Sequence, residues 1–322
     1  MNQFTLGLIA VVTLILGAVI IWDVKRVKIV KYKLKDSVAA YLFLAPALVL
    51  IVLFVIQPIV LSLLYGFTDY YLLEPNNIRY VGLDNFRALA EDYAQKGDLY
   101  HALKNTAYFV VLVVPLQIGA ALGLALLVNK PIRGNTFFKV AFFSPVVMSL
   151  TVISLLWLNI LRPDEQGMFN GLLSMIGIPP QKFLSDPDQA MNIIVLVSAW
   201  QGAGFQMMIF LAGLKNIPAD LYEAASLDGA SRWGKFRYVT LPGLKPTTVF
   251  IVITTFIGAT KLIIQPMIMT GYKSYTVTLS YLIYMEGYFF KMVGYASAIA
   301  LLVTILVGSA TMLQRYLLRE ED

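Results

Sequence analysis

Long apolar stretches alternate with short polar segments along the chain. Seven of the stretches approach or exceed the roughly 20 residues that a helix needs to cross a 30 Å hydrocarbon core. They cover residues 4–22, 39–66, 105–128, 137–161, 190–214, 247–266 and 292–314. The pattern predicts an all-α polytopic membrane protein with about seven transmembrane helices.

The first apolar stretch is separated from the other six by a basic segment over 23–37. No basic residue precedes it, so the pattern is typical of an anchor with its N-terminus outside and not of a cleaved signal peptide. We expect residues 1–38 to form this anchor with its basic linker, and 39–322 to form the main transmembrane domain. A cleaved signal peptide is the alternative.

The distribution of Lys and Arg predicts the orientation, because cytoplasmic segments are enriched in both. Segments 23–37, 129–139, 215–246 and the tail from 315 fall on one side of the membrane. They carry 16 of the 25 Lys and Arg and a net charge of +8, while the other side carries −2. The first side is therefore expected to be cytoplasmic, with the N-terminus outside and the C-terminus inside.

The composition agrees with a membrane protein and excludes two other classes. Of the 322 residues 58% are hydrophobic and 14% are charged, with a mean hydropathy of +0.73. Soluble chains average about 45–50% apolar and about 25% charged residues, so a soluble globular enzyme is excluded. The apolar content also excludes a disordered chain. We interpret the net charge of +6 as a topology signal and expect no nucleic-acid partner.

Several kinds of catalytic and cofactor site are excluded by the residues that the chain lacks. There is no Cys, and the single His101 cannot provide a His-rich metal site. Neither HExxH nor the phosphate-binding pattern GxxxxGK[ST] occurs. We therefore expect no metal, no cofactor and no enzymatic activity in this chain, and any ATP with its Mg must bind to another chain.

The cytoplasmic segment 215–246 has the signals of two short helices joined by a sharp turn. Pro218 suits a first helical position and Gly229 suits a left-handed turn. Ser231 can cap a second helix, and Pro242 is expected to stop it. We expect this segment to project from the spans as a helical hairpin.

The predicted hairpin has apolar side chains surrounded by charged ones. The apolar residues are Leu221, Ala224, Ala225, Trp233 and Phe236, and the charged ones are Asp220, Glu223, Asp228, Arg232, Lys235 and Arg237. An apolar surface with a charged rim is typical of a segment that docks in a groove of a partner. A hairpin that lies on lipid headgroups is the alternative.

The pattern EAASLDGA over 223–230, followed by Gly234 and by Leu241 with Pro242, resembles the EAA loop of permease subunits of binding-protein-dependent ABC importers. Further segments resemble the carbohydrate-uptake branch of these importers, namely 42–47, 81–86, 102–106, 143–145 and 294–298. The resemblance covers residues 40–315. The chain is similar to the maltose-type permease without its large outer domain.

The resemblance implies a multi-pass permease of the bacterial inner membrane with several partners. A homologous second permease would complete a heterodimer, a separate ATPase dimer would bind ATP and Mg, and an extracytoplasmic binding protein would deliver a sugar or oligosaccharide. The loop would dock in a groove of the ATPase, with Glu223 facing a basic residue. The coupling residues implied are Glu223, Ala224, Ala225, Leu227, Asp228 and Gly229.

A first candidate substrate segment lies in the stretch 190–214. Gln201 and Gln206 offer donors and acceptors for hydroxyl groups, while Phe205 and Trp200 offer flat apolar faces. Gly202 is expected to let a ligand approach the backbone. Packing of small residues between helices is the alternative. In maltose-type permeases the positions that match Gly202 and Phe205 lie at the sugar site.

A second candidate lies in the stretch 247–266. Thr254, Gly258 and Lys261 share one helix face. A Lys at the centre of a span costs about 2.5–3.5 kcal/mol, so Lys261 should face water, a partner or a ligand, unless its side chain extends to the headgroups. The family often has an Asp here, whereas this chain has Ile263 and Ile264. We therefore hypothesise that Lys261 favours an acidic saccharide.

Three other functions remain as alternatives. An importer permease for glycerol phosphate or a polyamine would share the same architecture. An ion-coupled secondary transporter typically has internal repeats and acidic residues in its spans, and neither is found here. An intramembrane enzyme needs a catalytic group set, and the spans contain none. The sequence favours a sugar importer permease.

Overall fold

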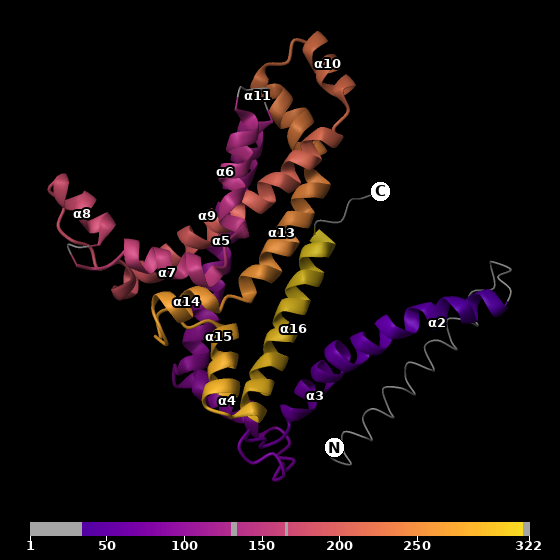
Figure 1. Ribbon diagram of the computed structural model, residues 1–322, viewed down its shortest axis with the longest axis vertical. Coiled ribbons are helices and arrows are strands. Elements are labelled where there is room, and N and C mark those ends of the chain that lie inside the picture. Colours follow the sequence, from indigo (N-terminus) through magenta and orange to yellow (C-terminus); the bar gives the residue numbers. More distant parts are fainter. Residues whose placement is uncertain (1–33, 130–133, 165–166, 318–322) are drawn as a thin grey trace.

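The computed structural model of the chain describes residues 34–129, 134–164 and 167–317 (Figure 1). These residues form helices joined by loops, and within these ranges the only β pairing consists of the isolated bridges Thr68–Tyr80 and Tyr71–Met292. The all-α fold is therefore confirmed. The predicted anchor over 4–22 lies outside the described residues.

Four helical stretches of the described part are long and apolar enough to cross a membrane. They are Phe43–Tyr65, Asp98–Val128, Pro187–Asn216 and Val293–Gln314. The first runs through α2 (Leu34–Ile51), η1 (Val52–Ile56) and α3 (Gln57–Tyr65), and the others belong to α5 (Asp98–Val128), α9 (Pro187–Asn216) and α16 (Val293–Leu317). Predicted spans 39–66, 105–128, 190–214 and 292–314 thus correspond to helices of the structure.

The predicted span 137–161 is not one straight helix. It consists of α6 (Asn135–Val147) and α7 (Leu150–Ile160), which meet at 98°. α6 ends two residues after Pro145, and Met148 has an extended backbone with φ −75° and ψ 142°. Hydropathy reports how apolar a segment is and cannot show a bend, so the prediction from hydropathy did not include this break.

The helix that follows Ser231 is also longer than predicted. It continues through α11 (Arg232–Lys235), η3 (Phe236–Thr240) and α12 (Leu241–Gly243), and it meets α13 (Lys245–Thr260) at 63°. Pro242 therefore does not stop this helix. The bend after Gly243 ends it instead.

The predicted span 247–266 ends early, because α13 stops at Thr260 and a separate short helix α14 (Ile264–Met269) follows. The hydroxyl groups of Ser280 and Thr278, at the start of α15 (Leu279–Tyr284), donate to the carbonyl oxygens of Thr260 and Leu262. These bonds satisfy backbone acceptors that a continuing helix would have paired. Lys261 therefore lies in the break and not inside a helical span.

The remaining elements lie at the two ends and on one side of the molecule. α4 (Asp84–Ala94) matches the short helix expected over 84–95, and Figure 1 shows it at the end opposite α10 (Ala219–Leu227). α8 (Met168–Met175) projects sideways beyond α7 (Figure 1). Two single turns, η2 (Phe183–Ser185) and η4 (Met285–Phe289), complete the described elements.

A close contact between α6 and α9 depends on one glycine. A Cβ atom at Gly204 would lie 2.2 Å from the carbonyl oxygen of Phe142, a backbone atom that cannot move aside. Small residues allow membrane helices to approach closely in this way. The neighbouring Met207 and Phe210 of α9 are fully buried, so the contact is part of the interior.

We expect Gly204→Ala to destabilise the protein, because forcing atoms into a packed interior costs about 1–3 kcal/mol. Thermal unfolding in detergent should show a lower melting temperature. Gly119→Ala is the matched control, since no heavy atom lies within 4 Å of its added Cβ. An unchanged melting temperature for Gly204→Ala would contradict the packing described here.

Candidate functional site

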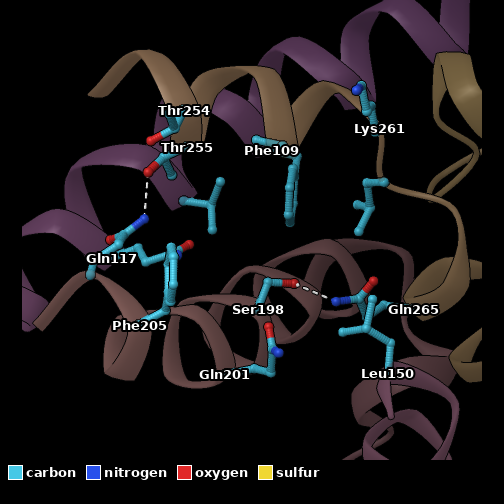
Figure 2. A pocket seen from close by; sticks show the side chains of 15 residues that line it. Phe109, Gln117, Leu150, Ser198, Gln201, Phe205, Thr254, Thr255, Lys261 and Gln265 are labelled. Carbon is cyan, nitrogen blue, oxygen red and sulfur yellow. Dashed lines mark hydrogen bonds between the residues drawn. The ribbon is translucent and has the colours of Figure 1, made fainter. Parts of the chain in front are cut away.

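A pocket of about 300 Å³ lies between α5, α9 and α13 and reaches the break after α13 (Figure 2). Its volume is at the lower end of the range for small-molecule sites. The polar lining residues are Gln117, Ser198, Gln201, Gln206, Thr254, Thr255, Lys261 and Gln265. The pocket lies near the middle of α5 and α9, as substrate sites of transporters do.

The structure brings together six of the seven predicted substrate residues. Gln201, Phe205, Gln206, Thr254, Gly258 and Lys261 all line this pocket, although they come from two segments about 50 positions apart in the sequence. Phe205 is 54% exposed and presents its ring to the cavity. The i, i+4, i+7 relation of Thr254, Gly258 and Lys261 therefore does place them beside one cavity.

Two residues of the first substrate segment do not line this pocket. Gly202 does not line the pocket, because a Cβ atom there would lie 2.0 Å from Nε2 of Gln117. The glycine thus admits a neighbouring side chain and not a ligand. Trp200 does not line this pocket either. Its ring packs against that of Trp157 at 5.7 Å, beside a separate apolar groove of about 290 Å³.

One end of the pocket is formed in part by the side-chain amide of Gln206. The Gln206 side chain is only 5% exposed, and its Nε2 donates to Oγ1 of Thr255. That hydroxyl in turn donates to the carbonyl oxygen of Ile251 at 2.6 Å. Oε1 of Gln206 is buried and has no partner among the described residues. A ligand hydroxyl is the kind of donor that would satisfy it.

The other end of the pocket is formed by Ser198, Gln265 and Lys261. Nε2 of Gln265 lies 3.5 Å from Oγ of Ser198. Figure 2 shows Phe109 between this end and the end formed by Gln117, Thr255 and Phe205. Lys261 is the one charged residue that the described chain contributes to the lining.

Several lining residues were not predicted from the sequence. Gln117, Ser198 and Gln265 are polar residues within predicted apolar spans, which is a signal of a functional position. Ser198 and Gln265 share helical spacing with the predicted residues Gln201 and Lys261, so periodicity could have found them, whereas Gln117 is alone in its segment. Phe109 and Leu262 carry no signal of this kind.

The segment 215–246 forms the predicted helical hairpin. α10 ends before Gly229, which has a left-handed φ of +75°, and Ser231 Oγ then accepts from the amide N of Gly234 at 3.1 Å. A hydrogen bond of 3.0 Å between the hydroxyls of Tyr222 and Thr240 joins α10 to η3. The hairpin is therefore held in one conformation.

The hairpin exposes apolar surface at one end of the molecule (Figure 1). Leu227 is 90% exposed and Trp233 is 66% exposed. Glu223, Ala224, Asp228 and Gly229 are also exposed, and Ala225 is half-buried. A surface of this kind is typical of a protein contact. The hairpin joins α9 to α13, and both of these helices line the pocket.

The family described as "binding-protein-dependent transport system inner membrane component" matches residues 122–320. The chain belongs to this family. The match includes α9, α13 and the hairpin between them, so the resemblance inferred from the EAASLDGA pattern is confirmed. The permease is an inner-membrane transport component with several candidate membrane helices.

Individual relatives cover most of the permease. The lactose transport system permease protein LacF of Rhizobium radiobacter is 34% identical over 292 residues, which cover 88% of this chain and 95% of that protein. The sn-glycerol-3-phosphate transport system permease protein UgpA of Brucella abortus is 32% identical over 289 residues, covering 88% and 96%.

A solved structure has the same fold. It is the crystal structure of a bacterial ABC transporter involved in the import of the acidic polysaccharide alginate. The match has a TM-score of 0.78 and 23% sequence identity, and it covers 88% of the permease and 96% of that chain. The chain therefore has a fold that has been seen before in a solved structure.

We expect Gly202→Ala to displace the Gln117 side chain and to remove one hydrogen-bonding group from the pocket. Loss of one hydrogen bond is worth about 0.5–1.5 kcal/mol, so KM for the transported solute should rise about threefold to tenfold. Gly123→Ala on α5, which has open space around its added Cβ, is the control. A KM equal to that of the wild type would contradict this placement of Gln117.

Proposed function

We propose that this chain is one of two homologous transmembrane subunits of an ATP-driven importer. The importer would accept a sugar or oligosaccharide from an extracytoplasmic binding protein and release it into the cytoplasm. In this proposal the chain binds the solute during passage but has no enzymatic activity, and ATP with Mg binds to a separate ATPase dimer.

The pocket is the single observation that supports a sugar substrate most directly. Amide and hydroxyl groups of Gln117, Gln201, Gln206 and Thr254 can bond to sugar hydroxyls, and the exposed ring of Phe205 suits the C–H face of a sugar ring. The residues lie midway along their helices, where a solute in transit must pass. An amino acid or a metal ion would require charged groups of both signs or carboxylates, which this lining lacks.

The relatives support the same substrate class and one alternative. LacF is named for lactose transport, and its similarity extends over nearly its whole length. UgpA, which is named for glycerol-3-phosphate transport, is almost as similar. A glycerol phosphate permease is therefore the second candidate, and Lys261 beside the pocket is the feature that favours it.

We propose that the hairpin couples the permease to the ATPase. Leu227 and the small residues Ala224 and Ala225 would enter an apolar groove, and Glu223 would pair with a cation of the ATPase. α10 follows α9 directly and leads through α11, η3 and α12 to α13, and both α9 and α13 line the pocket. We therefore expect a displacement of α10 to act on two walls of the pocket.

The proposed orientation places the hairpin and the C-terminus in the cytoplasm, α4 outside, and the N-terminus outside. The distribution of Lys and Arg supports this orientation. The stretch Phe43–Tyr65 has no buried side chain in the window that defines it as a candidate span, although it is strongly apolar. It is therefore available to membrane lipid and to the second permease.

We expect Glu223→Lys to abolish binding of the ATPase. Removing one partner of an interface charge pair costs about 2–5 kcal/mol, so hydrolysis stimulated by the loaded binding protein should fall at least about tenfold. The measurement is ATPase activity of the complex reconstituted in proteoliposomes, together with copurification of the ATPase. The substitution removes the proposed pair between Glu223 and a cation of the ATPase, and the new Lys repels that cation.

Glu91→Lys is the matched control, because it makes the same change on the exposed surface of α4 at the opposite end of the molecule. It should leave copurification of the ATPase intact. If Glu223→Lys retains the ATPase and its stimulation, the coupling proposal is wrong. Solute flux that follows an ion gradient without ATP would contradict the importer itself.

A further inference from the structure

We propose that the pocket selects a saccharide that carries a carboxylate, and that Lys261 is the specificity-determining residue. The inference rests on the proposed function of the pocket as the substrate site. It goes further by naming the chemical class of the sugar and the direction in which it binds.

The charge of the pocket is the first argument. Lys261 is the one charged side chain among the described lining residues, and no carboxylate lines the cavity. The described ion pairs are Arg79–Asp69, Arg87–Asp84 and Arg162–Asp164, so Lys261 is not neutralised by any of them. A lone cation beside a cavity favours an anionic ligand.

The position of Lys261 at the end of α13 is the second argument. A cation there interacts favourably with the helix dipole, and this effect alone could account for a basic residue. The same dipole end disfavours every anion, and a doubly charged phosphate more than a singly charged carboxylate. The single Lys, with no Arg among the described lining residues, therefore balances one carboxylate better than a phosphate.

The arrangement of the pocket gives the direction of binding. Thr255, whose hydroxyl accepts from Gln206, lies at one end, and Lys261 with Gln265 lies at the other, with Phe109 between them (Figure 2). A neutral sugar could hydrogen-bond at both ends but would gain no charge pairing with Lys261. An acidic sugar would place its hydroxyls near Gln206 and its carboxylate near Lys261.

The side chains at the second end can accommodate this carboxylate. Lys261 is exposed and its ammonium group is turned away from Ser198 in Figure 2, so its flexible four-carbon chain is free to turn toward a ligand. The Gln265 amide and the Ser198 hydroxyl provide neutral donors beside it. Their mutual contact of 3.5 Å is long, so a carboxylate can replace it at little loss.

The test measures uptake by the full importer in proteoliposomes, with digalacturonate and its neutral counterpart digalactose as probes. The two differ only in a carboxylate against a hydroxymethyl group on each ring. Each variant is compared with the wild type for the same sugar, so any preference of the binding protein cancels. sn-Glycerol 3-phosphate is the third probe, because it carries a phosphate and no ring.

We expect Lys261→Gln to lower kcat/KM for digalacturonate at least tenfold and to change that for digalactose less than twofold. Lys261→Arg should retain most uptake of the acidic sugar. Lys104→Gln, which removes an exposed positive charge on α5 outside the pocket, should affect neither sugar. ATPase activity stimulated by a loaded binding protein is measured in every variant and shows that the importer is intact.

Equal losses for both sugars, or no loss for digalacturonate, would overturn the inference while stimulated ATPase activity still supports the proposed function. If Lys261→Gln lowers only the uptake of glycerol 3-phosphate, the inference of a carboxylate ligand is wrong and a phosphate ligand replaces it. If no loaded binding protein stimulates ATP hydrolysis in the wild type, the proposed function fails and the inference fails with it.

Discussion

The need to pair every backbone polar group inside the membrane governs this structure. An unpaired carbonyl or amide in hydrocarbon costs several kcal/mol, so spans are helical unless other groups satisfy the break. At the end of α13, Ser280 and Thr278 donate to the carbonyl oxygens of Thr260 and Leu262. These bonds offset the free-energy cost of breaking the helix there. This break lets the pocket have both a polar lining and a cation at its edge.

The pocket and the hairpin are connected by two helices. The chain leaves the pocket along α9, forms the exposed hairpin, and returns to the pocket along α13. Gly204 brings α9 against α6, and the Tyr222–Thr240 hydrogen bond holds the hairpin to the start of the returning segment. In the proposed function, movement of the hairpin would reach the lining along α9 on one side and, past the 63° bend after α12, along α13 on the other.

Sequence reasoning succeeded where a pattern is local and failed where the outcome depends on distant neighbours. The EAASLDGA segment encodes its own turn at Gly229 and its own cap at Ser231, so the hairpin was predictable. Hydropathy located the spans but could not show the 98° bend after α6, and the early end of α13 depends on tertiary hydrogen bonds from Thr278 and Ser280. Gly202 could not be interpreted correctly, because the residue that fills its space, Gln117, lies on another helix.

In the proposed function, a solute crossing the membrane binds between α5, α9 and α13, at a site linked to the ATPase by the hairpin. A cryo-EM structure of the complete importer with its solute trapped during transport tests this most directly. We expect ligand density between Phe205, Thr254 and Lys261, with α10 bound in a groove of the ATPase. Ligand density elsewhere, or an α10 that contacts no partner, would contradict it.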